Sequence, residues 1–186
     1  SVRYGSLFIK PMQKYPIIAL VGPSGGGKTS LLLEMIRRYP DLCAPIKSKV
    51  TRARRNEQDG IFYDFVTPEE FAKLDAEGRL FQQMRFGGHR YGCDREQTDA
   101  IVAQKMGLVV LIQQSVVDFR NAGYRVHLVH IIPEGHHPRN EAQRIRDDEE
   151  RAKIQLDYDT TIINSFTPGG FKKATDALAK AIETIT

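Results

Sequence analysis

The eight residues Gly22-Pro23-Ser24-Gly25-Gly26-Gly27-Lys28-Thr29 decide the fold class of this 186-residue chain. They match the P-loop pattern G-x-x-x-x-G-K-[ST] at every fixed position. The short apolar run at residues 17–21 precedes them and suits a buried parallel strand, and residues 31–36 continue as a helix. A glycine turn that matched this pattern by chance would have neither the strand before it nor the helix after it. We therefore predict a strand, a phosphate-binding loop and a helix in this order.

The residue types of this loop suit a polyphosphate. Glycines let the backbone turn its N–H groups inward toward an anion, and the helix N-terminus adds partial positive charge. Lys28 places a full positive charge beside the transferred phosphate, and the hydroxyl of Thr29 can ligate Mg²⁺. We expect residues 22–29 to bind ATP, Mg²⁺ to be the cofactor with Thr29 as its protein ligand, and Lys28 to act in catalysis.

Bulk composition narrows the class of partner. The chain is 41% hydrophobic and 27% charged, as in an ordinary globular domain, with a formal net charge of +4. A phosphorylated substrate explains its arginines without nucleic acid, so we expect small nucleotides as partners. No apolar run approaches the roughly 18 residues of a membrane span. The two cysteines, Cys43 and Cys93, form no metal or redox motif, which favours a reducing cytoplasm.

Short apolar runs alternate with helical stretches along the chain, which indicates an α/β fold with a parallel sheet flanked by helices. Strands are expected at 17–21, 61–66, 80–86, 108–112, 126–132 and 161–164, and helices at 28–39, 68–78, 96–105, 139–155 and 171–182. The strongest helix start is Thr67-Pro68-Glu69-Glu70, with Thr67 as N-cap and Glu70 at the third helical position. We expect one P-loop NTPase domain over 12–186. Its core is 16–44 and 94–186, with an acceptor-binding insertion at 45–93 and a short lid near 134–150, and residues 1–11 precede it as an extension.

Residues 48–63 carry the second signal and read S-K-V-T-R-A-R-R-N-E-Q-D-G-I-F-Y. Together with the P-loop, this stretch resembles the guanylate kinase family, whose members carry S-x-T-T-R-x-x-R followed by Glu, Gly and Tyr. The matching residues are Ser48, Thr51, Arg52, Arg55, Glu57, Gly60 and Tyr63, with one residue fewer between Arg55 and Glu57. Further matches lie at 65–66, 69–71, 90–92 and 163–164, so the resemblance covers nearly all of the chain from residue 16.

The resemblance implies a phosphotransferase that moves the γ-phosphoryl group of ATP to GMP, giving ADP and GDP. In that family two arginines and two tyrosines bind the phosphate of the acceptor, and the matching positions are Arg52, Arg55, Tyr63 and Tyr91. The chemistry is sound, because a doubly charged phosphate suits bidentate guanidinium partners. Phenolic hydroxyls donate hydrogen bonds without adding charge.

The resemblance also implies a lid whose arginines reach the transferring phosphoryl group. Arg144 matches one of them and Arg139 stands in for the other, which makes Lys28, Arg55, Arg139 and Arg144 the expected catalytic set. Asn164 matches a residue that contacts the adenine of ATP, and it completes the ATP-binding set. A solvated helix with internal ion pairs is the alternative reading of the arginines near residue 146.

Base recognition is where the chain departs from the family. Relatives use carboxylates and a hydroxyl where this chain has Gln82, Cys93, and Leu111 with Gln113, although Ser48 is retained. Guanine presents N–H donors, which an ionised acceptor binds better than an amide does. We expect Ser48, Gln82 and Cys93 to face the acceptor.

Three readings remain open at the level of the sequence. The first is a GMP kinase with neutral base recognition, and the second is a kinase of another phosphorylated acceptor such as ribose 1,5-bisphosphate. The third is a non-catalytic module like the guanylate-kinase-like domains of scaffold proteins, which the intact P-loop disfavours. A monomer and a homodimer are both compatible with the sequence.

Overall fold

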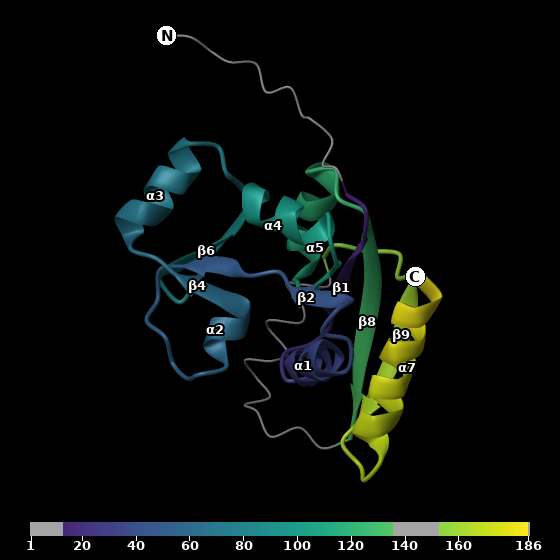
Figure 1. Ribbon diagram of the computed structural model, residues 1–186. Coiled ribbons are helices and arrows are strands. Elements are labelled where there is room, and N and C mark those ends of the chain that lie inside the picture. The colour runs from purple at the N-terminus through teal and green to yellow at the C-terminus, as the bar shows by residue number, and fades with distance from the viewer. Residues whose placement is uncertain (1–12, 136–152, 186) are drawn as a thin grey trace.

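Five parallel strands form the central sheet of the computed structural model, which describes residues 13–135 and 153–185 (Figure 1). Their order is β2-β7-β1-β8-β9. The strands are β1 (Ile17–Val21), β2 (Cys43–Pro45), β7 (Met106–Val110), β8 (Val126–Glu134) and β9 (Thr160–Ser165). Every pairing in this sheet is parallel, so the carboxyl ends of all five strands meet at one edge. The predicted α/β class with a parallel sheet is confirmed.

A smaller four-stranded sheet lies beside the central one, to its left in Figure 1. Its order is β4-β3-β6-β5, and only the β3–β4 pairing is parallel. The strands are β3 (Ser48–Val50), β4 (Tyr63–Phe65), β5 (Leu80–Phe86) and β6 (His89–Asp94), with α2 (Asp59–Phe62) and α3 (Pro68–Ala76) between them. This sheet therefore contains the basic segment that the sequence singles out.

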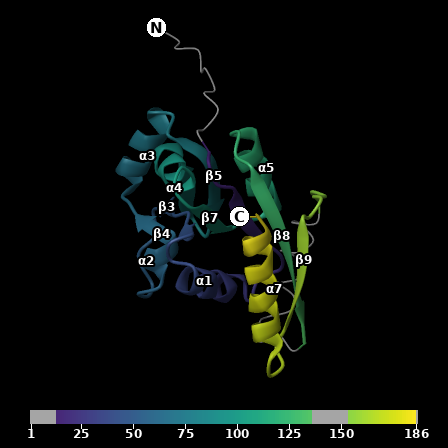
Figure 2. The same cartoon turned by 45° about the vertical axis from the view of Figure 1, so that its right-hand side comes forward.

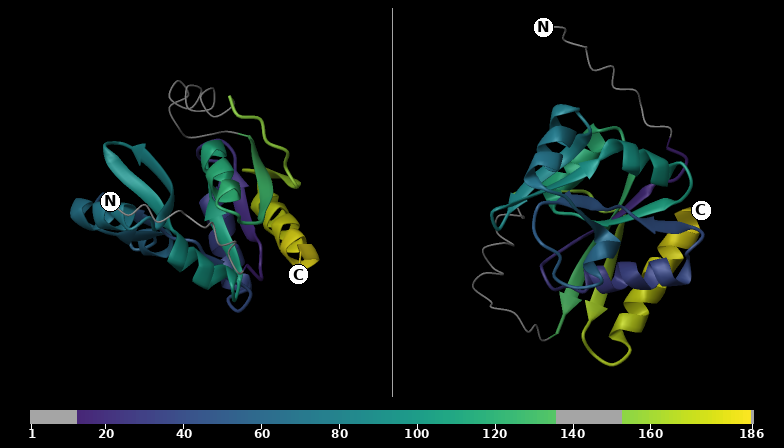
Figure 3. Two further views of the ribbon diagram at one scale, coloured as in Figure 1. Left: turned by 90° about the horizontal axis from the view of Figure 1, so that it is seen from above. Right: turned by 60° about the vertical axis from the view of Figure 1, so that its left-hand side comes forward.

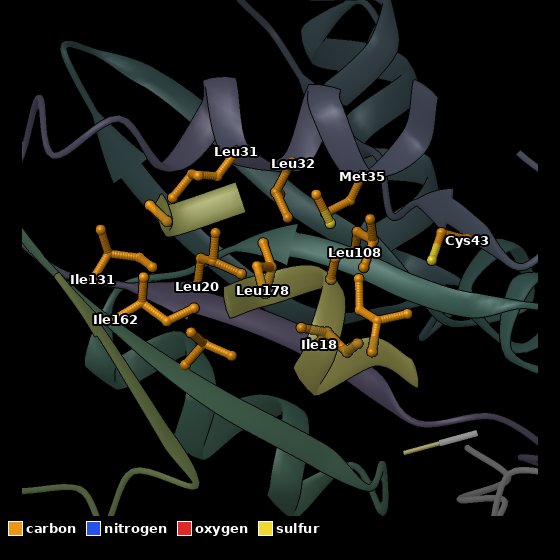
Figure 4. Close-up of a cluster of buried hydrophobic side chains, with 14 of the residues drawn as sticks. Ile18, Leu20, Leu31, Leu32, Met35, Cys43, Leu108, Ile131, Ile162 and Leu178 are labelled. Atoms are coloured by element: carbon orange, nitrogen blue, oxygen red, sulfur yellow. The ribbon is translucent and has the colours of Figure 1, made fainter. Parts of the chain in front are cut away.

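Helices cover both faces of the central sheet (Figures 2 and 3). On one face, α1 (Lys28–Arg38) and α7 (Gly170–Ile185) bury leucines and isoleucines against Ile18 and Leu20 of β1 (Figure 4). On the other face, α4 (Arg95–Val102) and α5 (Gln113–Asn121) pack toward Ile17 and Ala19. Successive side chains of a strand point to opposite faces, so the run at 17–21 is apolar throughout because both faces are covered. Within the described ranges, no helix has the length and apolarity needed to cross a membrane.

Glycine is required at two positions where the P-loop meets the rest of the fold. Gly27 has a φ of 81° as the N-cap of α1, and a Cβ there would lie 2.3 Å from Nδ2 of Asn164. A Cβ on Gly22 would lie 2.3 Å from the carbonyl oxygen of Ile131. Any larger side chain at either position would push the loop away from the sheet that supports it.

The structure confirms the capping box of α3 and corrects the strand predicted directly before it. Thr67 Oγ1 accepts a hydrogen bond from the backbone N–H of Glu70, whose carboxylate accepts one from the N–H of Thr67. The strand predicted at 61–66 is wrong in its first half, because a short helix occupies 59–62 and only 63–65 are extended. Turn-forming residues at 56–60 drive this helical turn, which Asn56 Oδ1 begins by accepting the N–H of Asp59 at 3.0 Å.

Helix α5 has no counterpart among the sequence predictions, since its polar start at Gln113 hides the pattern of a helix. The long helix predicted at 139–155 lies mostly outside the described residues, and residues 153–155 are not helical.

Candidate active site

A cleft of about 710 Å³ lies at the carboxyl edge of the central sheet and extends to the smaller sheet. This is the edge at which open parallel sheets bind ligands. Three regions contribute most of the lining: the P-loop, the smaller sheet and the connection from β7 to α5. The lining residues are Gly22, Ser24, Gly25, Gly27, Lys28, Thr29, Ser30, Ser48, Arg52, Arg55, Tyr63, Gln82, Met84, Phe86, Tyr91, Val110, Leu111, Ile112, Ser115 and Phe166.

The P-loop forms one end of the cleft, and its backbone carbonyls bind the side chain of its own lysine. Nζ of Lys28 donates to the carbonyl oxygens of Gly22 at 2.9 Å and Pro23 at 2.6 Å. Thr29 follows at the start of α1 and is exposed, so its hydroxyl is accessible from the cleft. An incoming polyphosphate would find backbone N–H groups, a helix N-terminus and a mobile ammonium together.

Asn164 supports the P-loop from behind. Its side chain is buried at 2% exposure, and Nδ2 donates to the carbonyl oxygen of Gly26 at 2.8 Å. The two residues are joined across the sheet because β9 brings Asn164 next to the loop. The contact seen here is thus with the loop itself, and a contact with adenine stays a prediction.

Asp59 organises the loop that carries the two predicted phosphate-binding arginines. Its carboxylate accepts hydrogen bonds from Nη1 of Arg52 at 2.9 Å, Nη2 of Arg52 at 3.3 Å and the backbone N–H of Arg55 at 2.8 Å. The bond to Arg52 is the largest cause that holds the pKa of Asp59 below its usual range. Nε of Arg52 is buried and has no hydrogen-bond partner within the described residues.

The two predicted tyrosines lie against this arginine. The guanidinium of Arg52 lies over the ring of Tyr63 at 4.8 Å, and the rings of Tyr63 and Tyr91 meet edge to face at 6.1 Å. Burial raises the pKa of Tyr63, so its hydroxyl remains a protonated donor at neutral pH. Arg55 is exposed at the same part of the cleft. This set can bind a phosphate with two cations and two neutral donors.

The part of the cleft expected to meet the base is neutral. Nε2 of Gln82 donates to Oγ of Ser115 at 3.0 Å, and both side chains line the cleft. Cys93 is buried behind this wall with Sγ 3.6 Å from Oγ of Ser48, so any effect on an acceptor passes through Ser48. Burial raises the pKa of Cys93 to about 11, so the thiol stays uncharged.

Carboxylates are missing from the described lining. None of the aspartates and glutamates in residues 13–135 and 153–185 lines the cleft, whereas Lys28, Arg52 and Arg55 do. Leu111 lines it at a position where relatives were expected to carry an acid. Across these same ranges, no three His, Cys, Asp or Glu side chains gather as a metal site would require. The described lining of the cleft therefore favours anionic ligands, and the hydroxyl of Thr29 lies at its P-loop end.

Most of the expected ATP-binding and acceptor-binding residues line one cleft. The exceptions are Pro23 and Gly26, which belong to the P-loop but are not in the lining, and Cys93 and Asn164, which are buried behind it. Arg139 and Arg144 lie outside the described residues. Sequence reasoning missed Asp59 and Ser115. The turn-forming segment at 56–60 was a local signal for Asp59, but Ser115 had none, because the packing of α5 against β5 places it.

A P-loop at the carboxyl edge of a parallel sheet, facing a cluster of arginines and tyrosines across one cleft, places this chain in the P-loop class of α/β proteins. The guanylate kinase family model matches residues 13–167. The chain belongs to the guanylate kinase family.

Three curated relatives, all guanylate kinases, illustrate the match. The chain is 32% identical to that of Mycoplasma mycoides over 185 residues, covering 90% of this chain and 61% of the relative. It is 31% identical to that of Streptomyces kasugaensis over 130 residues (69% and 63%), and 34% identical to that of Thermosynechococcus vestitus over 97 residues (52% and 51%). The matched segments thus span between about half and two thirds of these relatives' lengths.

A solved structure shows the same fold. The crystal structure of guanylate kinase from Anaplasma phagocytophilum superposes with a TM-score of 0.64 at 22% identity, covering 91% of this chain and 85% of that one.

Proposed function

We propose that this protein transfers the γ-phosphoryl group of ATP to GMP, giving ADP and GDP. One observation carries the proposal: the P-loop and the cluster of Arg52, Arg55, Tyr63 and Tyr91 line the same cleft. Two separate anion sites facing each other are what a kinase needs for a donor and a phosphorylated acceptor. Membership of the guanylate kinase family supports the choice of GMP.

The residues of the cleft suit this reaction without a general base. An oxygen of the acceptor phosphate is already anionic, so it can attack the γ-phosphorus while the bond to the β,γ-bridging oxygen breaks and ADP leaves. Lys28 would stabilise the β- and γ-phosphates, and Arg52 and Arg55 would hold the acceptor phosphate in line. Tyr63 and Tyr91 would donate to the same phosphate.

Mg²⁺ fits the site as a metal held mainly by the nucleotide. The hydroxyl of Thr29 would bind it, and phosphate oxygens and water would complete its coordination, as Mg²⁺ commonly retains several waters. When bound, the ion neutralises charge on the transferring phosphates.

Further roles follow from the family and stay proposals. Arg139 and Arg144 would close on the transferring group as lid arginines, and Asn164 would contact adenine if the loop opens around ATP. The partners would be ATP and GMP rather than nucleic acid, with a cytoplasmic location suggested by the free thiols of Cys43 and Cys93. A monomer and a homodimer both remain compatible with the proposal.

The test is a coupled assay of ADP release with ATP and Mg²⁺ against GMP, AMP, UMP and a sugar phosphate. Arg55→Ala should lower turnover with GMP by about 10²-fold or more, because a transition-state charge contact is lost, while ATP binding survives. Arg37→Ala is the matched control, since it removes an exposed arginine from α1 outside the cleft. Normal turnover of Arg55→Ala would remove Arg55 from the site, and a protein that ignores ATP would be a binding module.

A further inference from the structure

Gln82 and Ser115 form a hydrogen-bonded pair in the cleft, and the role assigned to this pair rests on the proposed function. Gln82 comes from β5 and Ser115 from the first turn of α5, which packs against that strand. Both residues are buried, at 4% and 2% exposure, and both line the cleft. The contact between them is 3.0 Å from Nε2 of Gln82 to Oγ of Ser115. The pair is therefore a buried part of the acceptor side of the cleft and not a contact on the protein surface.

The hydrogen bond determines what the carboxamide of Gln82 can offer a ligand. A side-chain amide carries an acceptor oxygen and an NH₂ group with two N–H donors, and both groups lie in one plane on the same carbon. Ser115 accepts one of the two N–H donors of this amide, and within residues 13–135 and 153–185 no group donates to Oε1 of Gln82. Oε1 of Gln82 is not among the fully buried atoms that lack a partner, so it is open to a ligand or water in the cleft. The pair therefore presents one oriented acceptor to the cleft.

The described lining of the cleft supplies no carboxylate beside Gln82. The apolar lining residues on β5 and directly after β7 are Met84, Phe86, Leu111 and Ile112, and the hydroxyl of Ser48 is a neutral polar group in the same lining. No described carboxylate lines the cleft. An ionised carboxylate can accept two parallel N–H bonds, as from N1–H and the 2-amino group of guanine, whereas one carbonyl oxygen in a fixed orientation accepts less well.

We propose that Ser115 is a positioning residue that orients Gln82 so that it offers the base one hydrogen-bond acceptor. The acceptor site would then bind 6-oxopurine nucleotides and discriminate only weakly between those with and without a 2-amino group. Both guanine and hypoxanthine carry N1–H, and this is the donor that a single acceptor requires. Adenine has an unprotonated N1 and suits an amide that is free to pair through both of its sides, as amides do with adenine edges. The bond to Ser115 fixes which way the amide faces and uses one of its two N–H donors.

The experiment measures kcat/KM for GMP, IMP and AMP with the wild-type chain and four variants. In the wild type, GMP should exceed IMP by no more than about tenfold, since one neutral hydrogen bond separates them. Gln82→Glu should raise the GMP-to-IMP ratio by about tenfold or more, because a carboxylate can accept both N–H groups. Ser115→Ala should raise AMP relative to GMP by about tenfold, and Ser115→Thr, which keeps the hydroxyl, should not.

Controls and outcomes separate this inference from the proposed function. Gln114→Ala removes an exposed neighbour of Ser115 and should leave all ratios unchanged. Ratios between acceptors are insensitive to a general loss of stability, and thermal melts of each variant check folding. A wild-type enzyme that uses GMP but rejects IMP by a thousandfold, or a Ser115→Ala variant with unchanged ratios, overturns the inference. A chain that binds ATP but phosphorylates no purine monophosphate overturns the proposed function itself.

Discussion

Replacing Asp59 by asparagine tests how the arginine-bearing loop is held. The side chains of Asp59 and Arg52 are 13% and 6% exposed, so their ion pair is largely removed from water. Asparagine keeps the size of the side chain but removes its charge and one of its acceptor oxygens. The variant therefore isolates the charge-assisted bonds from the packing of the loop.

The expected cost comes from the two bonds between Asp59 and Arg52. A hydrogen bond to a charged group contributes about 1.5–3 kcal/mol and a neutral one about 1 kcal/mol. The difference over two bonds, reduced for partial exposure, is about 2 kcal/mol of unfolding free energy. For a domain of this size that corresponds to a decrease in Tm of about 4–8 °C. The KM for GMP should rise by about tenfold because Arg52 loses its fixed position.

The pH dependence of the effect has a defined sign. The pKa of Asp59 is lowered in the folded state, chiefly by its bond to Arg52. The stability it provides is present above the unfolded pKa of about 4 and is lost as pH falls through the folded value. Chemical denaturation of wild type and Asp59→Asn at pH 7 and pH 3 should show a larger difference at pH 7. Asp41→Asn, at an exposed position, is the control and should change little at either pH.

One result would refute the reasoning. If Asp59→Asn kept its Tm and bound GMP more tightly, Asp59 would be a competitor of the acceptor phosphate for Arg52 and not its support.

Two further predictions concern the P-loop and the core. Asn164→Ala removes the donor to the carbonyl of Gly26 and should raise the KM for ATP several-fold, which steady-state kinetics with saturating GMP will show; an unchanged value would mean that the loop keeps its shape alone. Leu178→Ala creates a cavity between α7 and the sheet, so urea denaturation should give a loss of about 2–5 kcal/mol, and a loss below 1 kcal/mol would contradict the packing of Figure 4.

The parts of this protein that the sequence predicts well are contiguous. The P-loop, the strand before it and the helix after it lie within residues 17–38, and the arginine segment lies within 48–63. Their chemistry depends on neighbours a few residues apart, so spacing alone identifies it. The capping box of α3 can be predicted from the sequence for the same reason. The short helix at 59–62 is the local exception, because turn-forming residues outweighed an apolar run that predicted a strand.

The tertiary structure alone decides which groups from distant elements meet. Gln82 and Ser115 are 33 residues apart and Asn164 lies 138 residues from Gly26, yet each pair is joined by a hydrogen bond of 3.0 Å or less. Neither contact has a sequence signature. Each depends on strand order and on the packing of a helix against a sheet, which set distances that no spacing along the chain encodes.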